Sequence, residues 1–229
     1  MEYYSLNHIS EQLLLTVKQN KDTTKLKLEL SFTPFNELIN SLKNDEEKKA
    51  FWINIYNAYF LILRKELNIT KPKIYTEKII KIAEHYFSLD DIEHGILRKY
   101  RYKYSLGFIA NLFAPKLIKQ LAVTTIDYRI HFALNCGAIS CPPIAFYNTE
   151  NINKQLDLAT QSFLEHETEY IYAKKEVRTT MLFKWFLKDF GNFKGIKKIY
   201  KTQLNKDISD YSIKFKPYSW EENLNNFIQ

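Results

Sequence analysis

The sequence is short of the residues that break regular structure. Its 229 residues include only 5 glycines and 6 prolines, which argues against a loop-dominated or disordered chain. Hydrophobic residues make up 45% and charged residues 26%, an ordinary balance for a globular protein long enough to bury a core. There is neither an internal repeat nor a low-complexity linker, so we expect residues 1–229 to form a single domain.

Long apolar runs and a leader pattern are also lacking. No stretch approaches the ~18 uninterrupted apolar residues of a membrane span, and residues 1–8 do not place a basic region before an apolar one. We therefore expect a soluble, cytoplasmic protein without a membrane partner. In that compartment both cysteines stay reduced; the alternatives are a disulfide and a truncated leader.

Arginine is scarce although the formal net charge is +7. It stands only at positions 64, 98, 101, 129 and 178, so nearly all of the excess positive charge comes from scattered lysines. Base readout and bidentate phosphate binding favour arginine, so no specific nucleic-acid partner is expected. Cys136, Cys141 and a histidine supply at most three zinc ligands, without a CxxC pair. Neither a metal nor a cofactor is therefore expected.

Hydrophobic periodicity predicts a helix-rich chain. We expect hairpins over residues 78–87 and 169–180, a strand near 213–215, and helices over 10–19, 35–42, 45–68, 89–98, 111–121, 150–165 and 181–190. The helix 45–68 opens on three acidic residues and is apolar almost all round its middle, which is typical of a helix buried on most sides. Because the strands pair locally, the class is α+β, with a small antiparallel sheet and this central helix buried.

Three polar residues interrupt the apolar surface of the helix 45–68. Asn54, Asn57 and Arg64 fall on one stripe at helical spacing. A buried amide needs hydrogen-bond partners. The stripe therefore either binds neighbouring backbone or lines a polar cavity.

Segment 128–143 holds both cysteines of the chain. From residue 130 to residue 135, apolar and mixed side chains alternate, which predicts a strand, and Gly137 and the prolines at 142 and 143 then break the pattern. A thiol such as Cys136 at a strand end, near the imidazole of His131, is typical of a reactive cysteine. A buried structural cysteine beside a core histidine gives the same pattern.

Several segments, taken in order, resemble the family known as domain of unknown function 547. They are residues 51–58, 88–98, 129–138 and 140–143, then Trp185, Asp189-Phe190 and Tyr218-Ser219-Trp220, a slightly altered form of the family's Tyr-Asp-Trp ending. The match covers a core of about residues 45–225, and we expect residues 1–44 to be a helical extension packed on it. The family's name assigns no function. The resemblance implies that its typical positions matter here: Asn54, Asn57, Glu93, His94, Arg98, His131, Asn135, Cys136, Ser140 and Cys141.

One chemistry that these positions support is a thiol nucleophile. Cys136 would attack an acyl carbon with His94 or His131 as base, and Glu93 or Asn135 would orient the imidazole. His94 is the better base, because on a straight strand His131 and Cys136 point to opposite faces. The positions expected to bind substrate are Asn54, Asn57, Arg98, Asn135, Ser140 and Cys141.

The pattern of a helix followed by a histidine strand is distantly similar to the papain and transglutaminase folds. In those folds the cysteine starts the core helix, whereas here that helix carries asparagines, so a conventional papain-type triad is not expected. We expect the N–H groups of Gly137 and Ala138, or an imidazolium, to lower the pKa of the Cys136 thiol. Cys141 is disfavoured because the two prolines after it lack an N–H group.

The alternative to catalysis is a buried polar network of Glu93, His94, Arg98 and Arg129 that locks helix to strand, with the cysteines as core residues. The same cluster could bind a small anionic ligand or a peptide end. The sequence therefore favours a thiol-dependent acyl hydrolase or transferase. The alternative is a non-catalytic ligand- or protein-binding or scaffold domain, and the partner in either case is an unknown small molecule or peptide.

Overall fold

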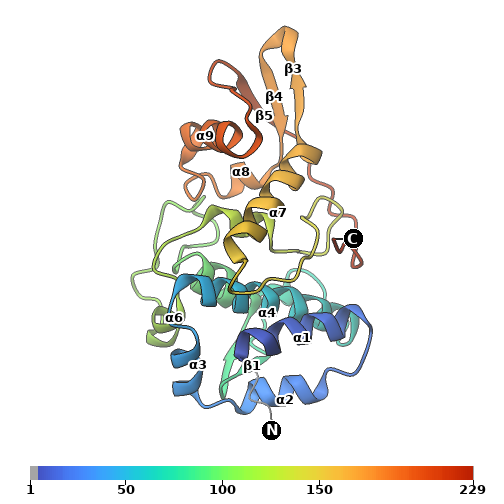
Figure 1. Ribbon diagram of the computed structural model, residues 1–229, viewed down its shortest axis with the longest axis vertical. Helices are drawn as coiled ribbons and strands as arrows, with labels where there is room; N and C mark the ends of the chain where they lie inside the picture. The colour runs from blue at the N-terminus through green and yellow to red at the C-terminus, as the bar shows by residue number, and fades with distance from the viewer. Residues whose placement is uncertain (1–4, 229) are drawn as a thin grey trace.

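The computed structural model describes residues 5–228. The expectation about residues 1–8 concerns in part residues 1–4, which lie outside the described residues. In chain order (Figure 1) the elements are α1 (Leu6–Lys18), α2 (Thr24–Phe32), α3 (Phe35–Ser41), α4 (Asp45–Lys65), α5 (Lys73–Thr76), β1 (Ile80–Ile82), β2 (His85–Phe87), the π-helix η1 (Asp91–Leu97), α6 (Lys116–Leu121), the 3-10 helix η2 (Tyr128–Phe132), α7 (Ile152–Glu167), β3 (Glu169–Ile171), the 3-10 helix η3 (Tyr172–Lys174), β4 (Glu176–Thr179), α8 (Leu182–Trp185), α9 (Asn192–Leu204) and β5 (Ser212–Phe215).

Helix α4 is the buried central helix that the sequence predicts. Asn44 and Glu47 form a capping box at its start, in which each side chain accepts a hydrogen bond from the other residue's backbone N–H. Every residue from Lys48 to Leu63 is buried. The apolar run needs cover on all sides, and α1 lies along one flank of α4 (Figure 1).

The buried side chains form two hydrophobic clusters, joined by α7. The larger cluster surrounds α4 and takes in Ile152 and Leu156 from the first half of α7. The smaller cluster lies among β3, β4, α8 and α9 and takes in Phe163 and Leu164 from the second half. Helix α7 accordingly runs between the lower and upper regions of the molecule (Figure 1).

The strands form two small sheets. Strands β1 and β2 make the expected hairpin, which turns at Ala83 and Glu84 with positive φ at both residues. Strands β3 and β4 make the second expected hairpin, and Lys175 in its turn is left-handed. Strand β5 then pairs with β4 in parallel. The α+β class is confirmed, with one antiparallel and one mixed sheet.

The strand expected over residues 130–135 is wrong. Residues 128–132 form the 3-10 helix η2, where the Asp127 side chain accepts a hydrogen bond from the Arg129 backbone N–H. The following backbone bonds remain local, from the N–H groups of Ala133 and Leu134 to the carbonyl of Ile130. All six residues from 130 to 135 are buried. The alternation of side-chain types along these residues therefore does not correspond to one buried and one solvent-exposed face, which is what the strand prediction assumed.

Other boundaries also differ from the expected ones. The helix expected over 111–121 is shorter: α6 begins after Pro115, because proline has no N–H group to donate inside a helix and is tolerated only at its start. Helix α8 ends at Trp185, so the helix expected over 181–190 is mostly turns. Helices α2 and α9 were not predicted. The apolar stripe of α2 is weak, whereas α9 has a clear one, with Ile196, Ile199 and Tyr200 buried at helical spacing, that the prediction missed. Within the described residues, no helix is both long and apolar enough to cross a membrane.

Candidate functional site

A cavity of about 380 Å³ opens where α4, α5, η1, α8 and the carboxy-terminal segment meet. Much of its wall is aromatic: Tyr56, Tyr75, Tyr104, Trp185, Phe186, Tyr218 and Trp220. The lining also contains ionisable side chains, both cysteines and four other residues: Asp90, Glu93, His94, Lys103, His131, Cys136, Cys141, Leu106, Leu134, Pro142 and Leu182. The cavity therefore unites the four residues predicted to be catalytic, although η1 and the cysteine segment are far apart in sequence.

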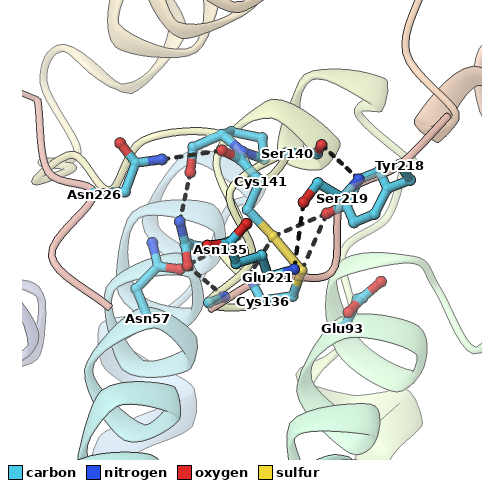
Figure 2. Close-up of a disulfide and its surroundings, with 12 residues drawn as sticks. Asn57, Glu93, Asn135, Cys136, Ser140, Cys141, Tyr218, Ser219, Glu221 and Asn226 are labelled. Carbon is cyan, nitrogen blue, oxygen red and sulfur yellow. Dashed lines mark hydrogen bonds between the residues drawn. A yellow bond between two sulfur atoms is a disulfide. The ribbon is translucent and has the colours of Figure 1, made fainter. Parts of the chain in front are cut away.

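Asparagines shape the turn that carries the cysteines (Figure 2). The Asn57 amide donates to the Ala133 carbonyl and accepts from the Asn135 N–H, both at 3.0 Å. The Asn135 amide in turn donates to the Pro142 carbonyl and accepts from the Gly137 N–H, both at 2.7 Å. Asn57 and Asn135 are buried and bind backbone, so they hold the turn in place and do not line the cavity.

Asn54 has the same role and lies about one turn before Asn57 in α4. Its amide donates to the Tyr147 carbonyl at 2.8 Å and accepts from the Tyr147 N–H at 3.1 Å. The first alternative for the polar stripe, hydrogen bonding to neighbouring backbone, therefore applies to Asn54 and Asn57. Arg64 is different, because it lies near the end of α4 and binds Glu222 at 2.6 Å.

The carboxy-terminal segment pairs with the cysteine turn. The Ser219 N–H donates to Ser140 Oγ at 2.9 Å, and the Ile139 N–H donates to the Glu221 carbonyl at 2.8 Å. Figure 2 shows this segment beside the turn, with the Tyr218 ring next to the two sulfur atoms. Ser140 thus positions Tyr218 at the wall without lining the cavity itself.

Cys136 and Cys141 form a disulfide, so the alternative to the expected reduced thiols applies. The Tyr218 hydroxyl lies 3.2 Å from Cys136 Sγ and 3.0 Å from Cys141 Sγ. The Cys136 N–H points to Cys141 Sγ at 3.0 Å. The Gly137 N–H, expected to stabilise a Cys136 thiolate, is instead donated to Asn135. Of these two backbone N–H groups, the one that reaches a sulfur is that of Cys136, and it donates to Cys141 Sγ.

A buried ion pair lies behind one wall of the cavity. Arg98 is fully buried and donates from Nε to Asp189 Oδ2 at 2.6 Å and from Nη1 to His94 Nδ1 at 2.8 Å. His131 Nε2 lies 3.0 Å from the same Asp189 oxygen. Both imidazoles are therefore held by partners. Among residues 5–228, no hydrogen bond joins either imidazole to a cysteine sulfur.

Burial disfavours the charged form of both histidines. Burial, reinforced by the charge of Arg98 and opposed by Glu93, lowers the pKa of His94 to about 4. Burial also lowers the pKa of His131, although Asp189 acts in the opposite direction. The surroundings of the two imidazoles therefore disfavour an imidazolium that would activate a thiolate.

Glu93 is the acidic group that faces the cavity. Its side chain is only 14% exposed, and its Oε2 accepts a hydrogen bond from the Tyr56 hydroxyl at 3.1 Å. Burial opposes ionisation, but the attraction of the nearby His94, Arg98 and His131 side chains and this hydrogen bond outweigh it and lower the pKa of the carboxyl. Figure 2 shows Glu93 extending from η1 toward the side of the disulfide where Tyr218 lies.

Asp90 has its own counter-charge. The Lys103 ammonium contacts both of its carboxylate oxygens, at 2.9 and 3.0 Å. The same ammonium lies 4.9 Å from the centre of the Tyr75 ring. Lys103 therefore pairs with Asp90 and not with Glu93, whose Oε1 instead lies 3.6 Å from His94 Nδ1.

Arg129 does not belong to this site, contrary to the expected network with Glu93, His94 and Arg98. It binds Asp127 at 2.7 Å and Asp157 at 2.9 Å in a separate polar hollow near the start of α4. Sequence reasoning placed it with the others because all four lie in family motifs. In the described portion of the chain, no three His, Cys, Asp or Glu side chains are grouped to hold a metal ion.

The structure adds residues to the candidate site that the sequence did not assign to it. Asp189, Trp185, Tyr218 and Trp220 stand in family motifs, but nothing in their local pattern linked them to Glu93. Tyr56 lies one residue before Asn57 on α4, and the apolar residues around it in the sequence indicated an ordinary core aromatic. Only the distance between Tyr56 and Glu93 identifies it as a site residue.

Comparison with known proteins gives one match. The model of the family described as a protein of unknown function, DUF547, covers residues 39–164, more than half of the chain. The matched range includes α4, η1 and the cysteine turn, whereas α8 and the Tyr218 segment lie beyond it. No curated protein and no solved structure matches the chain. The chain belongs to the DUF547 family.

Proposed function

We propose that the aromatic cavity binds a small molecule or a peptide segment that carries a positive charge, with Glu93 as the group that recognises this charge. The observation that carries the proposal is the position of the Glu93 carboxyl at the wall of an aromatic cavity, where it accepts a hydrogen bond from the Tyr56 hydroxyl. A lowered pKa favours the carboxylate form of Glu93, and a cation that enters the cavity can pair with it away from bulk water.

The charges of the cavity support a cationic ligand. Asp90 and Glu93 carry two negative charges and Lys103 carries one positive charge, so the lining has one net negative charge. Arg98 forms an ion pair with Asp189 and does not line the cavity. An anionic ligand, one expectation from the sequence, is therefore disfavoured. The contrast with the whole chain, which carries +7, makes the local charge a recognition feature.

The aromatic wall supports the same choice. Aromatic faces attract cations, and the attraction grows when the cation leaves water. Lys103 already places its ammonium 4.9 Å from the Tyr75 ring centre. Trp185, Tyr218 and Trp220 pack together with ring centres 4.7 to 5.6 Å apart and are held as one wall. This wall offers further ring surface beside the cysteine turn.

Titration with two molecules of the same shape tests the proposal. Choline carries a quaternary ammonium, and 3,3-dimethyl-1-butanol is its neutral analogue. Changes in the fluorescence of Trp185 and Trp220 report binding, because both rings line the cavity. We expect choline to bind more tightly than the alcohol, and Glu93→Gln to weaken choline binding by about tenfold or more, as for the loss of an ion pair excluded from water.

Glu165→Gln is the matched control, because it removes the same charge from an exposed position on α7. It should leave choline binding unchanged. Equal affinity for choline and the alcohol, or equal weakening by both variants, would contradict recognition by Glu93.

The second candidate is the thiol-dependent acyl hydrolase or transferase expected from the sequence. The observation that favours it is the position of Cys136 in the wall of the same cavity as Glu93, His94 and His131. It requires reduction of the disulfide and a base other than the imidazoles in their present hydrogen bonds. Turnover of a p-nitrophenyl ester by the reduced protein, abolished by Cys136→Ser but not by Cys141→Ser, would support it.

A further inference from the structure

The two sulfurs of the Cys136–Cys141 disulfide have different surroundings. The disulfide joins the only two cysteines of the chain and lies in the cavity wall. Cys136 is partly exposed, whereas Cys141 is only 4% exposed. Of the two cysteines, Cys136 is therefore the more accessible residue to a molecule that enters the cavity.

Hydrogen-bond donors are gathered at the other sulfur. Cys141 Sγ accepts from the Cys136 N–H at 3.0 Å, a donor that Cys136 Sγ does not share, and the Tyr218 hydroxyl lies 3.0 Å from Cys141 Sγ and 3.2 Å from Cys136 Sγ. Burial, with Glu167 and Glu93 nearby, raises the pKa of Tyr218, so the phenol keeps its proton and remains a donor. Packing against Trp185 and Trp220 fixes the ring in this position.

This asymmetry matches what thiol–disulfide exchange requires. A thiolate attacks one sulfur of a disulfide, and the other sulfur leaves with the electron pair of the S–S bond. The reaction is faster when the leaving thiolate is stabilised. Here the accessible sulfur and the stabilised leaving sulfur are different atoms of the same bond, Cys136 Sγ and Cys141 Sγ.

We propose that the Cys136–Cys141 pair is a redox-active disulfide that oxidises a dithiol entering the cavity. One thiolate of the dithiol attacks Cys136 Sγ, and the S–S bond breaks with Cys141 leaving as a thiolate. The second thiolate of the dithiol then attacks the first sulfur of the dithiol, which is bonded to Cys136 Sγ in the mixed disulfide. This bond breaks, and Cys136 is released as a thiolate. The dithiol loses two electrons and two protons and becomes a disulfide, and the two cysteines gain them and become thiols.

This activity is independent of the cationic ligand proposed above. It depends on access to Cys136 and on the donors at Cys141, and not on the charge of Glu93. The two proposals can therefore fail separately: loss of choline binding leaves the exchange reaction intact, and an inert disulfide leaves choline binding intact.

Mapping of the mixed disulfide tests the proposal on the full chain. In Cys141→Ser, the single thiol at position 136 should react with the disulfide reagent 5,5′-dithiobis(2-nitrobenzoate), forming a mixed disulfide and releasing 5-thio-2-nitrobenzoate, while the protein stays folded, as judged by circular dichroism. In Cys136→Ser, the thiol at position 141 should react only after unfolding. Equal reactivity of the two folded variants, or faster reaction at position 141, would overturn the assignment of roles.

Reduction of the wild-type protein by dithiothreitol gives a second test. Thiols should appear while the protein remains folded, and oxidised dithiothreitol should restore the disulfide. If thiols appear only at the rate of global unfolding, the disulfide is a structural crosslink and the proposal is wrong.

The role of Tyr218 can be separated from a purely structural one. Tyr218→Phe removes the hydroxyl next to Cys141 and should slow reduction by dithiothreitol roughly two- to tenfold, the effect of one hydrogen bond. It should also raise the pKa of the Cys141 thiol in the reduced protein, measured by the ultraviolet absorbance of the thiolate. Tyr147→Phe is the control: Tyr147 is buried outside the cavity, and its hydroxyl has no partner among the described residues. Equal rates and pKa values in the two variants would exclude Tyr218 as the leaving-group donor.

Discussion

At the scale of single residues, the polar groups of this chain divide into those that hold the backbone and those that face the cavity. The amides of Asn54 and Asn57 bind buried backbone groups, and Arg98 binds a buried carboxylate. Glu93 combines deep burial with an ionised group turned toward the cavity. The sequence marks all four as unusual polar residues, but their roles follow from their partners.

Replacing Asn57 by leucine should destabilise the protein although leucine is more hydrophobic. The change leaves the Ala133 carbonyl and the Asn135 N–H buried without a partner, because Asn57 is fully buried. We expect the free energy of unfolding to fall by roughly 2–4 kcal/mol in urea denaturation. Asn40→Leu, on an exposed position of α3, is the control and should change it little. A midpoint for Asn57→Leu as high as that of the wild type would mean that the two backbone groups find water.

Asp189→Asn should destabilise the protein far more than removal of a charge from a solvent-accessible ion pair. It leaves the Arg98 guanidinium, which is fully buried, without its counter-charge. Breaking a buried ion pair on one side typically costs on the order of 3–5 kcal/mol. Asp157→Asn makes the same change in a partly exposed pair with Arg129 and should cost about 1 kcal/mol or less. Thermal or urea unfolding of both variants checks the difference, and equal losses would contradict it.

At the scale of elements, the loop between η1 and α6 closes over the ion pair of Arg98 and Asp189. Gly107 in this loop has φ +84, a conformation that L side chains rarely adopt. A Cβ at this position would overlap Asp189 Oδ1. The loop thus approaches the pair as closely as a glycine permits, and the adjacent residue Leu106 lines the cavity.

Two glycine substitutions separate backbone constraint from helix propensity. Gly107→Ala should lower the free energy of unfolding by about 1–3 kcal/mol, because the conformation and the overlap are both unfavourable. Gly95→Ala, in η1, brings a Cβ to 3.0 Å from the Cγ2 methyl of Ile118, so this side chain must shift by a few tenths of an ångström, a cost that opposes the gain in propensity. Alanine also gains roughly 1 kcal/mol of helix propensity there, so we expect a change close to zero. Similar losses in the two variants, measured by chemical denaturation, would mean that Gly107 has room to adjust.

At the scale of the whole molecule, stability should depend on pH through the buried histidines. The pKa of His94 falls from an ordinary 6.5 to about 4 because the imidazole is buried. Between these two pH values the unfolded chain binds a proton that the folded chain does not bind. The free energy of unfolding therefore decreases as the pH falls through this window, by about 3 kcal/mol at its lower end. His131, whose pKa is also lowered, contributes in the same direction.

Urea denaturation at about pH 7 and about pH 5 measures this dependence. The range stays above the region where Glu93 and Asp189, whose pKa values are lowered, lose their own contribution to stability. His94→Gln keeps an acceptor for Arg98 but cannot titrate, so it should reduce the slope. His166→Gln, on an exposed position of α7, should not. An unchanged slope in His94→Gln would mean that the buried imidazole binds a proton as readily as in the unfolded chain.

The sequence by itself determined the class of the fold and its central element. The long apolar run with acids at its start could only be a buried helix, because no solvent-facing stripe of the necessary width exists along it. The two hairpins were also readable, because their turns and alternation are local. Family motifs further indicated that Glu93, His94, His131 and Cys136 belong together, and the cavity contains all four.

Only the tertiary structure decided what these residues do. Alternation predicted a strand at residues 130–135, but burial on every side removed the distinction between faces on which that prediction depends. The cysteines became a disulfide because the turn between them, held by Asn57 and Asn135, brings the sulfurs together. The partners of Glu93 and of both sulfurs come from segments far along the chain, α4 and the Tyr218 segment. Charge and hydrogen bonding act through space, so the chemistry of this site depends on contacts that local sequence patterns do not encode.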